Sequence, residues 1–342
     1  NFGSGARVPG GFSYYYLWFF LQFTKDIKEI YLIFSILTIT SFVFLAYTIK
    51  QYLNLLSFTL ICIFFFTSKL INMEILRFWN PVLGLHLLIF SYAFFFRFLK
   101  SKKFLELFYC YIFCYLSTQF HLSFFSIAIT FLLISLFLKK ENKFNFIFNI
   151  VIFLFSIIIC YISNIFHIFY PFSNLDIIIK PSSLDINQYI DLNFQLLRNF
   201  LSTIYNIQSF TQVPGNVSYK LPLMSIIIGF LAFIILLKPD FKIENKKNYY
   251  EVFKILSFII LLTLIFYSIS LTFGQYNYEG KQVIGFTLLY QSRYFLAVSP
   301  IFAILSGISF AIIIKKLLTL KNKFFSIFFL ITIFLLILLR VT

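Results

Sequence analysis

The longest apolar segment of the chain, residues 104–138, reads FLELFYCYIFCYLSTQFHLSFFSIAITFLLISLFL. A continuous helix over these 35 residues would be about 52 Å long, whereas the hydrocarbon core of a bilayer is about 30 Å thick. The polar run Ser117-Thr118-Gln119, followed by His121, interrupts the segment near its middle. We therefore expect a turn at this run and two short helices in place of one.

Apolar bands of similar character cover most of the remaining chain, in which 61% of residues are apolar and only 12% are charged. Together with the broken segment they predict an all-α integral membrane protein with about ten transmembrane helices. The other bands lie at roughly 30–49, 54–67, 81–96, 145–170, 221–237, 252–272, 293–314 and 324–340.

The basic residues decide the orientation of these bands. The net charge is +16, and more than half of the lysines and arginines stand in short loops near residues 50, 100, 140, 240 and 315. Short basic loops face the cytoplasm, where they meet anionic headgroups, so the charge does not indicate nucleic-acid binding. All five loops fall on one side only if the segment 104–138 turns back on itself, which supports the predicted break.

With ten spans and the basic loops in the cytoplasm, residues 1–29, 171–220 and 273–292 fall together on the external side. We expect residues 1–29 to form an external loop with a juxtamembrane, interfacial helix over 12–23, although an ordinary aromatic belt explains that segment equally well. Residues 30–342 form the multi-span domain, and its external loops 171–220 and 273–292 are expected to contain short helices.

The four cysteines lie inside apolar bands, which excludes a disulfide framework and a zinc site. They are small hydrophobic residues in this interpretation. No two histidines have the spacing of metal ligands, and no cofactor is predicted, although a divalent metal is compatible with the chain. The cysteines are Cys62, Cys110, Cys114 and Cys160.

Arg293 and Tyr294 stand at the start of an apolar band, in the run Gln291–Pro300. A guanidinium at this level either snorkels to headgroups or binds a phosphate through two oxygens. Lys281 could supply a second cation, or it could be an ordinary solvated lysine. Arg77 could face the same anion, or it could simply pair with Glu74 one helical turn away.

His121 lies at the predicted external turn, beside Gln119, where an imidazole could donate to a ligand or relay a proton. The alternative is that it caps a helix. His86 and His167 are interpreted as packing residues.

Three short motifs on the external side resemble those of one family. Arg7-Val8-Pro9-Gly10-Gly11-Phe12-Ser13-Tyr14-Tyr15-Tyr16 resembles the first external loop of bacterial GT-C glycosyltransferases, in which a proline turn precedes a tyrosine-rich juxtamembrane helix. Gln119-Phe120-His121-Leu122-Ser123 is similar to a Gln-x-His-x-Ser stretch of these proteins, and Arg293-Tyr294 followed by Pro300 is similar to their Arg-Tyr-apolar-Pro segment. The relatives are protein O-mannosyltransferases, aminoarabinose transferases and lipopolysaccharide-core sugar transferases.

The resemblance implies transfer of a sugar from a polyprenyl-phosphate donor to a lipid-linked or cell-envelope acceptor, on the external face of a bacterial inner membrane. It implies donor-phosphate binding by Arg293, Tyr294, Arg77 and Lys281. The substrate-binding residues would then be Arg7, Tyr14, Tyr15, Tyr16, Gln119 and His121.

The family activates its acceptor with an acidic residue in the first external loop. No acid precedes Asp26 here, so we expect this residue upstream of Asn1, in a longer protein of which this chain is an N-terminally truncated part.

Two other classes remain open. A polysaccharide polymerase of the O-antigen type would use the loop 171–220, which contains only one arginine, Arg198. A transporter or flippase needs ionisable or helix-breaking residues in mid-membrane, of which the bands offer almost none.

Overall fold

The structure is a computed structural model, and it describes part of the chain. The described residues are 12–66, 80–121, 124–137, 143–169, 179–181, 186–205, 220–238, 243, 245–270, 273–276, 282–283, 297–319, 327 and 331.

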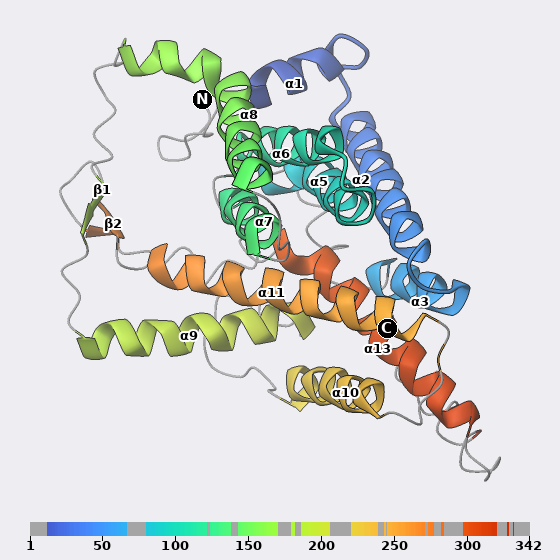
Figure 1. Cartoon of the computed structure of the whole chain (residues 1–342). Helices are drawn as coiled ribbons and strands as arrows, with labels where there is room; N and C mark the ends of the chain where they lie inside the picture. Colours follow the sequence, from blue (N-terminus) through green and yellow to red (C-terminus); the bar gives the residue numbers. More distant parts are fainter. Residues whose placement is uncertain are drawn as a thin grey trace.

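The described residues are mostly helical, as predicted, and include one small sheet (Figure 1). The helices are α1 (Phe12–Leu21), α2 (Ile27–Lys50), α3 (Leu55–Phe66), α5 (Asn80–Ser101), α6 (Phe104–Thr118), α7 (Phe125–Phe137), α8 (Lys143–Phe169), α9 (Ile186–Tyr205), α10 (Lys220–Leu237), α11 (Lys246–Ser270) and α13 (Ser299–Leu318). The strands are β1 (Ile179–Pro181), β2 (Phe273–Tyr276) and β3 (Gln282–Val283).

The predicted break in the segment 104–138 is confirmed. Helix α6 ends at Thr118, the backbone turns at Gln119–His121, and α7 begins at Phe125. The N–H of Gln119 bonds to the carbonyl of Tyr115 and that of Phe120 bonds to the carbonyl of Ser117, which closes the last turn of α6. The hydroxyls of Ser117 and Thr118 donate to the carbonyls of Cys114 and Tyr115, so the polar run also satisfies free carbonyls at the end of α6.

Four described helical stretches are long and apolar enough to cross a membrane. They are Ile27–Lys50, Leu83–Ser101, Lys246–Ile269 and Ser299–Leu318. Shorter apolar helices accompany them, among them α3, α6 and the apolar part of α7. A membrane-embedded protein fits these helices, whereas the number of ten spans stays a prediction.

The two faces of α2 differ in the way expected of a helix between protein and lipid. One face is buried and includes Ile30, Phe34 and Phe42. The opposite face carries large apolar side chains that are 41–60% exposed, a pattern that is unfavourable in water and suits a bilayer. These exposed side chains are Leu32, Ile36, Ile39, Val43 and Tyr47.

Helices α5 and α6 form a closely packed antiparallel hairpin, and α2 packs against α5. Gly84 of α5 allows the closest approach, because a Cβ atom there would lie 2.9 Å from the Cβ of Phe120 and 3.1 Å from the carbonyl oxygen of Ser117. Helices α3 and α13 meet as closely, since a Cβ on Gly307 would lie 2.5 Å from the backbone nitrogen of Ile61. The two glycines let backbones touch in place of side chains, as is common between membrane helices.

The prediction for the two long loops was incomplete, because they contain strands and one long helix. Strand β1, from the loop 171–220, pairs antiparallel with β2, from the loop 273–292, and β2 pairs with β3. Helix α9 has 20 residues, not the few expected of a short interfacial helix, and it packs against α10 and α11. The hydroxyl of Tyr189 lies 3.0 Å from that of Ser268 and ties α9 to the end of α11. The two loops thus meet each other, as loops on one face of a membrane can.

Candidate functional site

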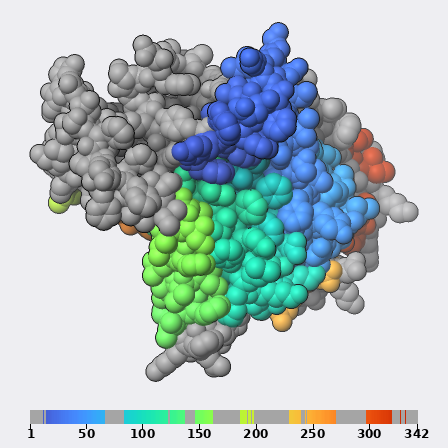
Figure 2. Space-filling model, turned by 90° about the horizontal axis from the view of Figure 1, so that it is seen from above, coloured from blue at the N-terminus to red at the C-terminus, as the bar shows by residue number. Residues whose placement is uncertain are grey.

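Helix α1 is the only described part of the first predicted motif, and it lies against α5 and α6 (Figure 2). Its sequence, FSYYYLWFFL, is aromatic on all sides. The inner side chains, among them Phe12, Tyr16 and Phe20, pack on a small buried cluster that includes Phe34 and Phe120. Trp18 and Phe19 on the outer side are half exposed or more. This end of the α2, α5 and α6 unit is called the α1 end below.

Gln119 joins three elements at the α1 end. Its Oε1 accepts a hydrogen bond of 3.0 Å from the backbone N–H of Phe12, the first residue of α1. Its Nε2 donates to the backbone carbonyl of Cys160 in α8. The side chain is fully buried, so the predicted substrate-binding amide is used on both sides to hold α1 and α8 against the α6–α7 turn.

Tyr16 makes a second joint, with His86 of α5. Its hydroxyl lies 2.7 Å from Nε2 of His86, and the two rings stack with centroids 5.7 Å apart. Burial raises the pKa of Tyr16 to about 12, so its hydroxyl stays protonated throughout the physiological range. Nδ1 of His86 is buried and has no hydrogen-bond partner among the described residues. His86 therefore does more than the packing predicted for it, because its imidazole also holds α1 in place through the contact with the hydroxyl of Tyr16.

The ring of Tyr16 lies at the centre of a group of aromatic side chains. Centroids of the neighbouring rings lie 5.1–5.7 Å from that of Tyr16, mostly in edge-to-face geometry. Such pairs add about 0.5–1.5 kcal/mol each beyond the burial of their surface. We call this group the aromatic joint; its members are Phe12, Tyr16, Phe20, Phe34, His86 and Phe120.

Two predicted substrate-binding residues border the joint and keep accessible surface. Tyr15 lies on the outer side of α1 and is 70% exposed. His121 is partly exposed at the α6–α7 turn, with its ring 5.8 Å from that of Phe124. Among the described candidates, these two side chains are the ones placed to meet a ligand.

The other candidates lie outside what the structure describes. Tyr14 belongs to α1, but its side chain is not among the described ones. The remaining positions outside the described residues are Arg7, Arg77, Lys281, Arg293 and Tyr294. The described residue nearest in sequence after Tyr294 is Ala297, whose carbonyl accepts a hydrogen bond of 2.9 Å from the hydroxyl of Tyr92 on α5.

The acidic group nearest to α1 in the chain has a structural role. Asp26 precedes α2, and its Oδ1 accepts a hydrogen bond of 2.9 Å from the N–H of Lys28. It is therefore the N-cap of α2. Within the described ranges, no three His, Cys, Asp or Glu side chains lie close enough together to hold a metal ion. The four cysteines are free thiols.

Sequence reasoning did not find His86, Phe34 and Phe120 as partners of α1. The available signal was weak: a single histidine in the apolar band 81–96, and an unusually aromatic segment 12–23 that needed a partner of similar character. Which helix faces meet is decided by the rotation of each helix, which the hydrophobic pattern of nearly all-apolar helices does not define.

Comparison with known proteins gives no relative: no protein-family model matches the chain, and neither a curated protein nor a solved structure is significantly similar to it.

Proposed function

We propose that the chain is a membrane glycosyltransferase that moves a sugar from a polyprenyl-phosphate donor to a lipid-linked or cell-envelope acceptor on the external face. The observation that supports the proposal most is the direct contact between two of the three family-like motifs. They stand 107 residues apart, and the hydrogen bond from Phe12 to Gln119 holds them together at one end of the helices.

The buried residues of this end would position the site, not bind the substrate. The hydroxyl of Tyr16 pairs with Nε2 of His86, and the amide of Gln119 pairs with two backbone groups. Tyr15 and His121, at the border of the joint, would then contact the sugar or the lipid tail of the donor. A tyrosine can stack on a sugar ring, and an imidazole can donate to a hydroxyl or phosphate oxygen.

The chemistry requires a cation at the donor phosphate. Departure of a polyprenyl phosphate develops negative charge on its oxygens, and fixed donors of positive charge lower the barrier for that step. A guanidinium offers two parallel N–H groups and stays charged. Arg293 is the proposed group, with Tyr294, Arg77 and Lys281 beside it. The acceptor hydroxyl also needs a general base.

The test is sugar transfer by the intact protein in membranes, with a panel of radiolabelled polyprenyl-phosphate hexoses. Arg293→Ala should reduce transfer at least a hundredfold, as expected for loss of one group that stabilises a leaving anion. Lys315→Ala, which removes a cation from the last turn of α13, is the matched control and should transfer normally. Full activity of Arg293→Ala in well-inserted protein would contradict the phosphate-binding role. Products that carry long chains of repeat units would instead identify a polysaccharide polymerase.

A further inference from the structure

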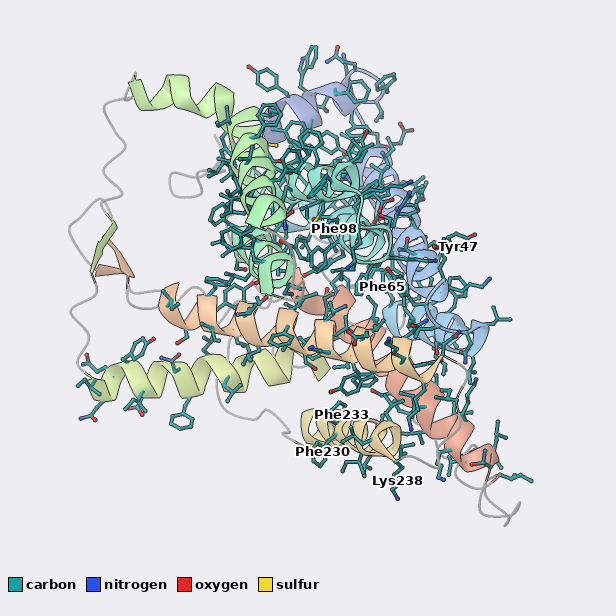
Figure 3. The ribbon with its side chains drawn as sticks, viewed as in Figure 1. Tyr47, Phe65, Phe98, Phe230, Phe233 and Lys238 are labelled. Carbon is teal, nitrogen blue, oxygen red and sulfur yellow. The ribbon has the colours of Figure 1, made fainter. Side chains whose placement is uncertain are left out.

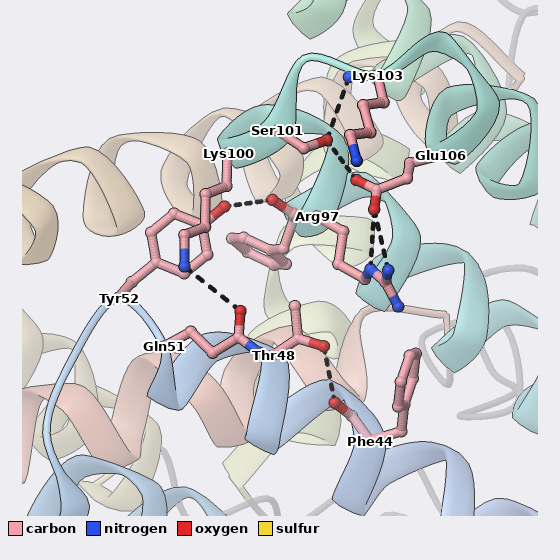
Figure 4. A network of polar contacts seen from close by, with 10 residues as sticks. Phe44, Thr48, Gln51, Tyr52, Arg97, Lys100, Ser101, Lys103 and Glu106 are labelled. Carbon is pink, nitrogen blue, oxygen red and sulfur yellow. Dashed lines mark hydrogen bonds and ion pairs between the residues drawn. The ribbon is translucent and has the colours of Figure 1, made fainter.

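The end of α2, α5 and α6 opposite to the α1 end holds a separate hollow, the basic pocket, and Figure 4 shows the polar contacts of its residues. Helix α2 ends there at Lys50, α5 ends at Ser101, and α6 begins at Phe104. The hollow has a volume of about 430 Å³. It is lined by Phe44, Tyr47, Thr48, Gln51, Tyr52, Arg97, Lys100, Ser101 and Glu106.

The carboxylate of the pocket is fully engaged. Oε1 of Glu106 lies 3.0 Å from both Nε and Nη2 of Arg97. Oε2 accepts a hydrogen bond of 2.6 Å from the hydroxyl of Ser101. Only 12% of the Glu106 side chain is exposed, against 43% of Arg97. The carboxylate therefore fixes the arginine at the wall of the pocket and leaves part of the guanidinium facing outward.

Two lysines add positive charge around Arg97. Nζ of Lys100 lies 3.4 Å from Oε1 of Gln51 and 5.6 Å from the ring centroid of Tyr52. Nζ of Lys50 lies 5.7 Å and 5.9 Å from the rings of Phe58 and Tyr47. Neither lysine makes an ion pair with a carboxylate in the described part of the chain.

The charges of the pocket do not cancel. Lysines in the last turn of α2 and α5 also neutralise the negative ends of the helix dipoles, each equivalent to about half an elementary charge. Among the lining residues, Arg97 and Lys100 oppose the carboxylate of Glu106, and the N-terminus of α6, equivalent to about half a positive charge, offsets one of the two helix C-termini. The pocket is therefore net positive and suits an anion such as a phosphodiester, which carries a single negative charge.

Aromatic side chains of α2 and α5 lie beside Arg97. The guanidinium carbon of Arg97 lies 5.9 Å from the ring of Phe44 and 5.6 Å from that of Phe94. Tyr47 is 53% exposed and projects from the outer side of α2 (Figure 3). It is the last residue of the exposed apolar row on α2 that begins at Leu32.

The pocket lies at the ends of the helices that line it. Two of the four candidate spans, Ile27–Lys50 and Leu83–Ser101, end at it. The ends of spans lie at the level of lipid headgroups, and the apolar row of α2 runs from there into the hydrocarbon layer. A ligand that fits both parts has a phosphate at one end and acyl chains at the other.

We propose that the basic pocket binds the headgroup of an anionic glycerophospholipid. Its phosphodiester lies beside Arg97 and Lys100, and one acyl chain follows the exposed row Ile36, Ile39, Val43 and Tyr47 along α2. This site is distinct from the aromatic joint and does not depend on the proposed sugar transfer.

The experiment measures lipid binding by the purified full chain in detergent micelles, titrated with phosphatidylglycerol or with phosphatidylcholine and followed by native mass spectrometry. Wild-type protein should retain phosphatidylglycerol in preference to phosphatidylcholine. Lys100→Glu should weaken phosphatidylglycerol binding at least tenfold, because it changes the local charge by two units and each unit near a membrane surface contributes about a fivefold change.

The matched control is Lys238→Glu, which makes the same charge change at an exposed lysine after the end of α10, away from the pocket (Figure 3). It should bind phosphatidylglycerol within twofold of wild type. Equal loss of binding in both variants, or no loss in Lys100→Glu, would overturn the proposal. Melting temperatures without added lipid show whether each variant is folded. If Lys100→Glu is not folded, Lys100→Gln replaces it, and its affinity for phosphatidylglycerol should fall about fivefold.

Competition with glycerol 3-phosphate separates a lipid from a free phosphate ester. The soluble ester should not displace phosphatidylglycerol at equal concentration, because it lacks the chains that would lie on α2. Equal competition would show a site for soluble phosphate esters and would overturn the assignment to a lipid.

Discussion

The two ends of the α2, α5 and α6 unit use the same three helices in opposite ways. At the α1 end, the hydroxyl of Tyr16 pairs with Nε2 of His86, and the amide of Gln119 pairs with the backbone, beside an aromatic joint with no net charge. At the other end, Arg97 and Lys100 line an open pocket together with a single carboxylate, that of Glu106. The closed end can therefore position neighbouring groups, whereas the open end can bind a ligand with its own side chains.

The largest effect is expected from truncating a buried side chain of the aromatic joint. Phe120→Ala should lower the free energy of unfolding by about 3–5 kcal/mol, because Phe120 is 1% exposed and its loss leaves a cavity between α1 and α6. Chemical denaturation in mixed micelles measures this value. Phe23→Ala, at a residue that is 72% exposed, is the control and should change it by less than about 0.5 kcal/mol. Similar losses in both would mean that the joint is not a closed core.

A medium effect is expected from Arg97→Ala at the basic end. It leaves the mostly buried carboxylate of Glu106 with Ser101 as its remaining partner, and we expect a loss of about 2 kcal/mol. The double variant Arg97→Met with Glu106→Met removes both charges and should recover most of this loss. If the double variant is as unstable as Arg97→Ala, the ion pair is not the cause.

The smallest effect is expected from Tyr16→Phe, which removes the hydrogen bond to His86 and keeps the ring. The loss should be about 1 kcal/mol below pH 10. Because burial raises the pKa of Tyr16 from 10.0 to about 12, the folded state keeps this proton longer than the unfolded state does. The stabilising contribution of Tyr16 is therefore complete below pH 10 and is lost as the pH rises towards 12, so the difference between wild type and variant should shrink. Denaturation curves at pH 8 and pH 11 measure this change, and a constant difference would contradict the buried hydroxyl.

The sequence alone predicted correctly those elements that depend on a local pattern of residues. Polar residues in the middle of an overlong apolar segment predicted the turn at Gln119–His121, and the apolar band 221–237 corresponds to α10 within one residue. The strands were missed because they contain only two to four residues, and β1 pairs with a strand about a hundred residues later, which no local pattern reports.

The candidate site was predicted less completely than the fold. The parity of the spans put Tyr16 and Gln119 on one face, but their partners Phe12, His86 and Cys160 depend on how the helices are rotated and how deeply they pack. The basic pocket was foreseen only as positive charge in two loops. The single carboxylate that organises it, Glu106, has no distinguishing sequence context.

The small sheet has a consequence for biosynthesis. Ile179 of β1 pairs with Gln275 of β2, so β1 has no partner until the ribosome has added almost a hundred further residues. At about 5–20 residues per second, this interval lasts on the order of 5–20 s. During that time α9, α10 and α11 are synthesised, and β1 is not yet paired with β2. In a chain that stalls before β2, both edges of β1 lack a partner strand, whereas the finished sheet, in the order β1-β2-β3, pairs one of them.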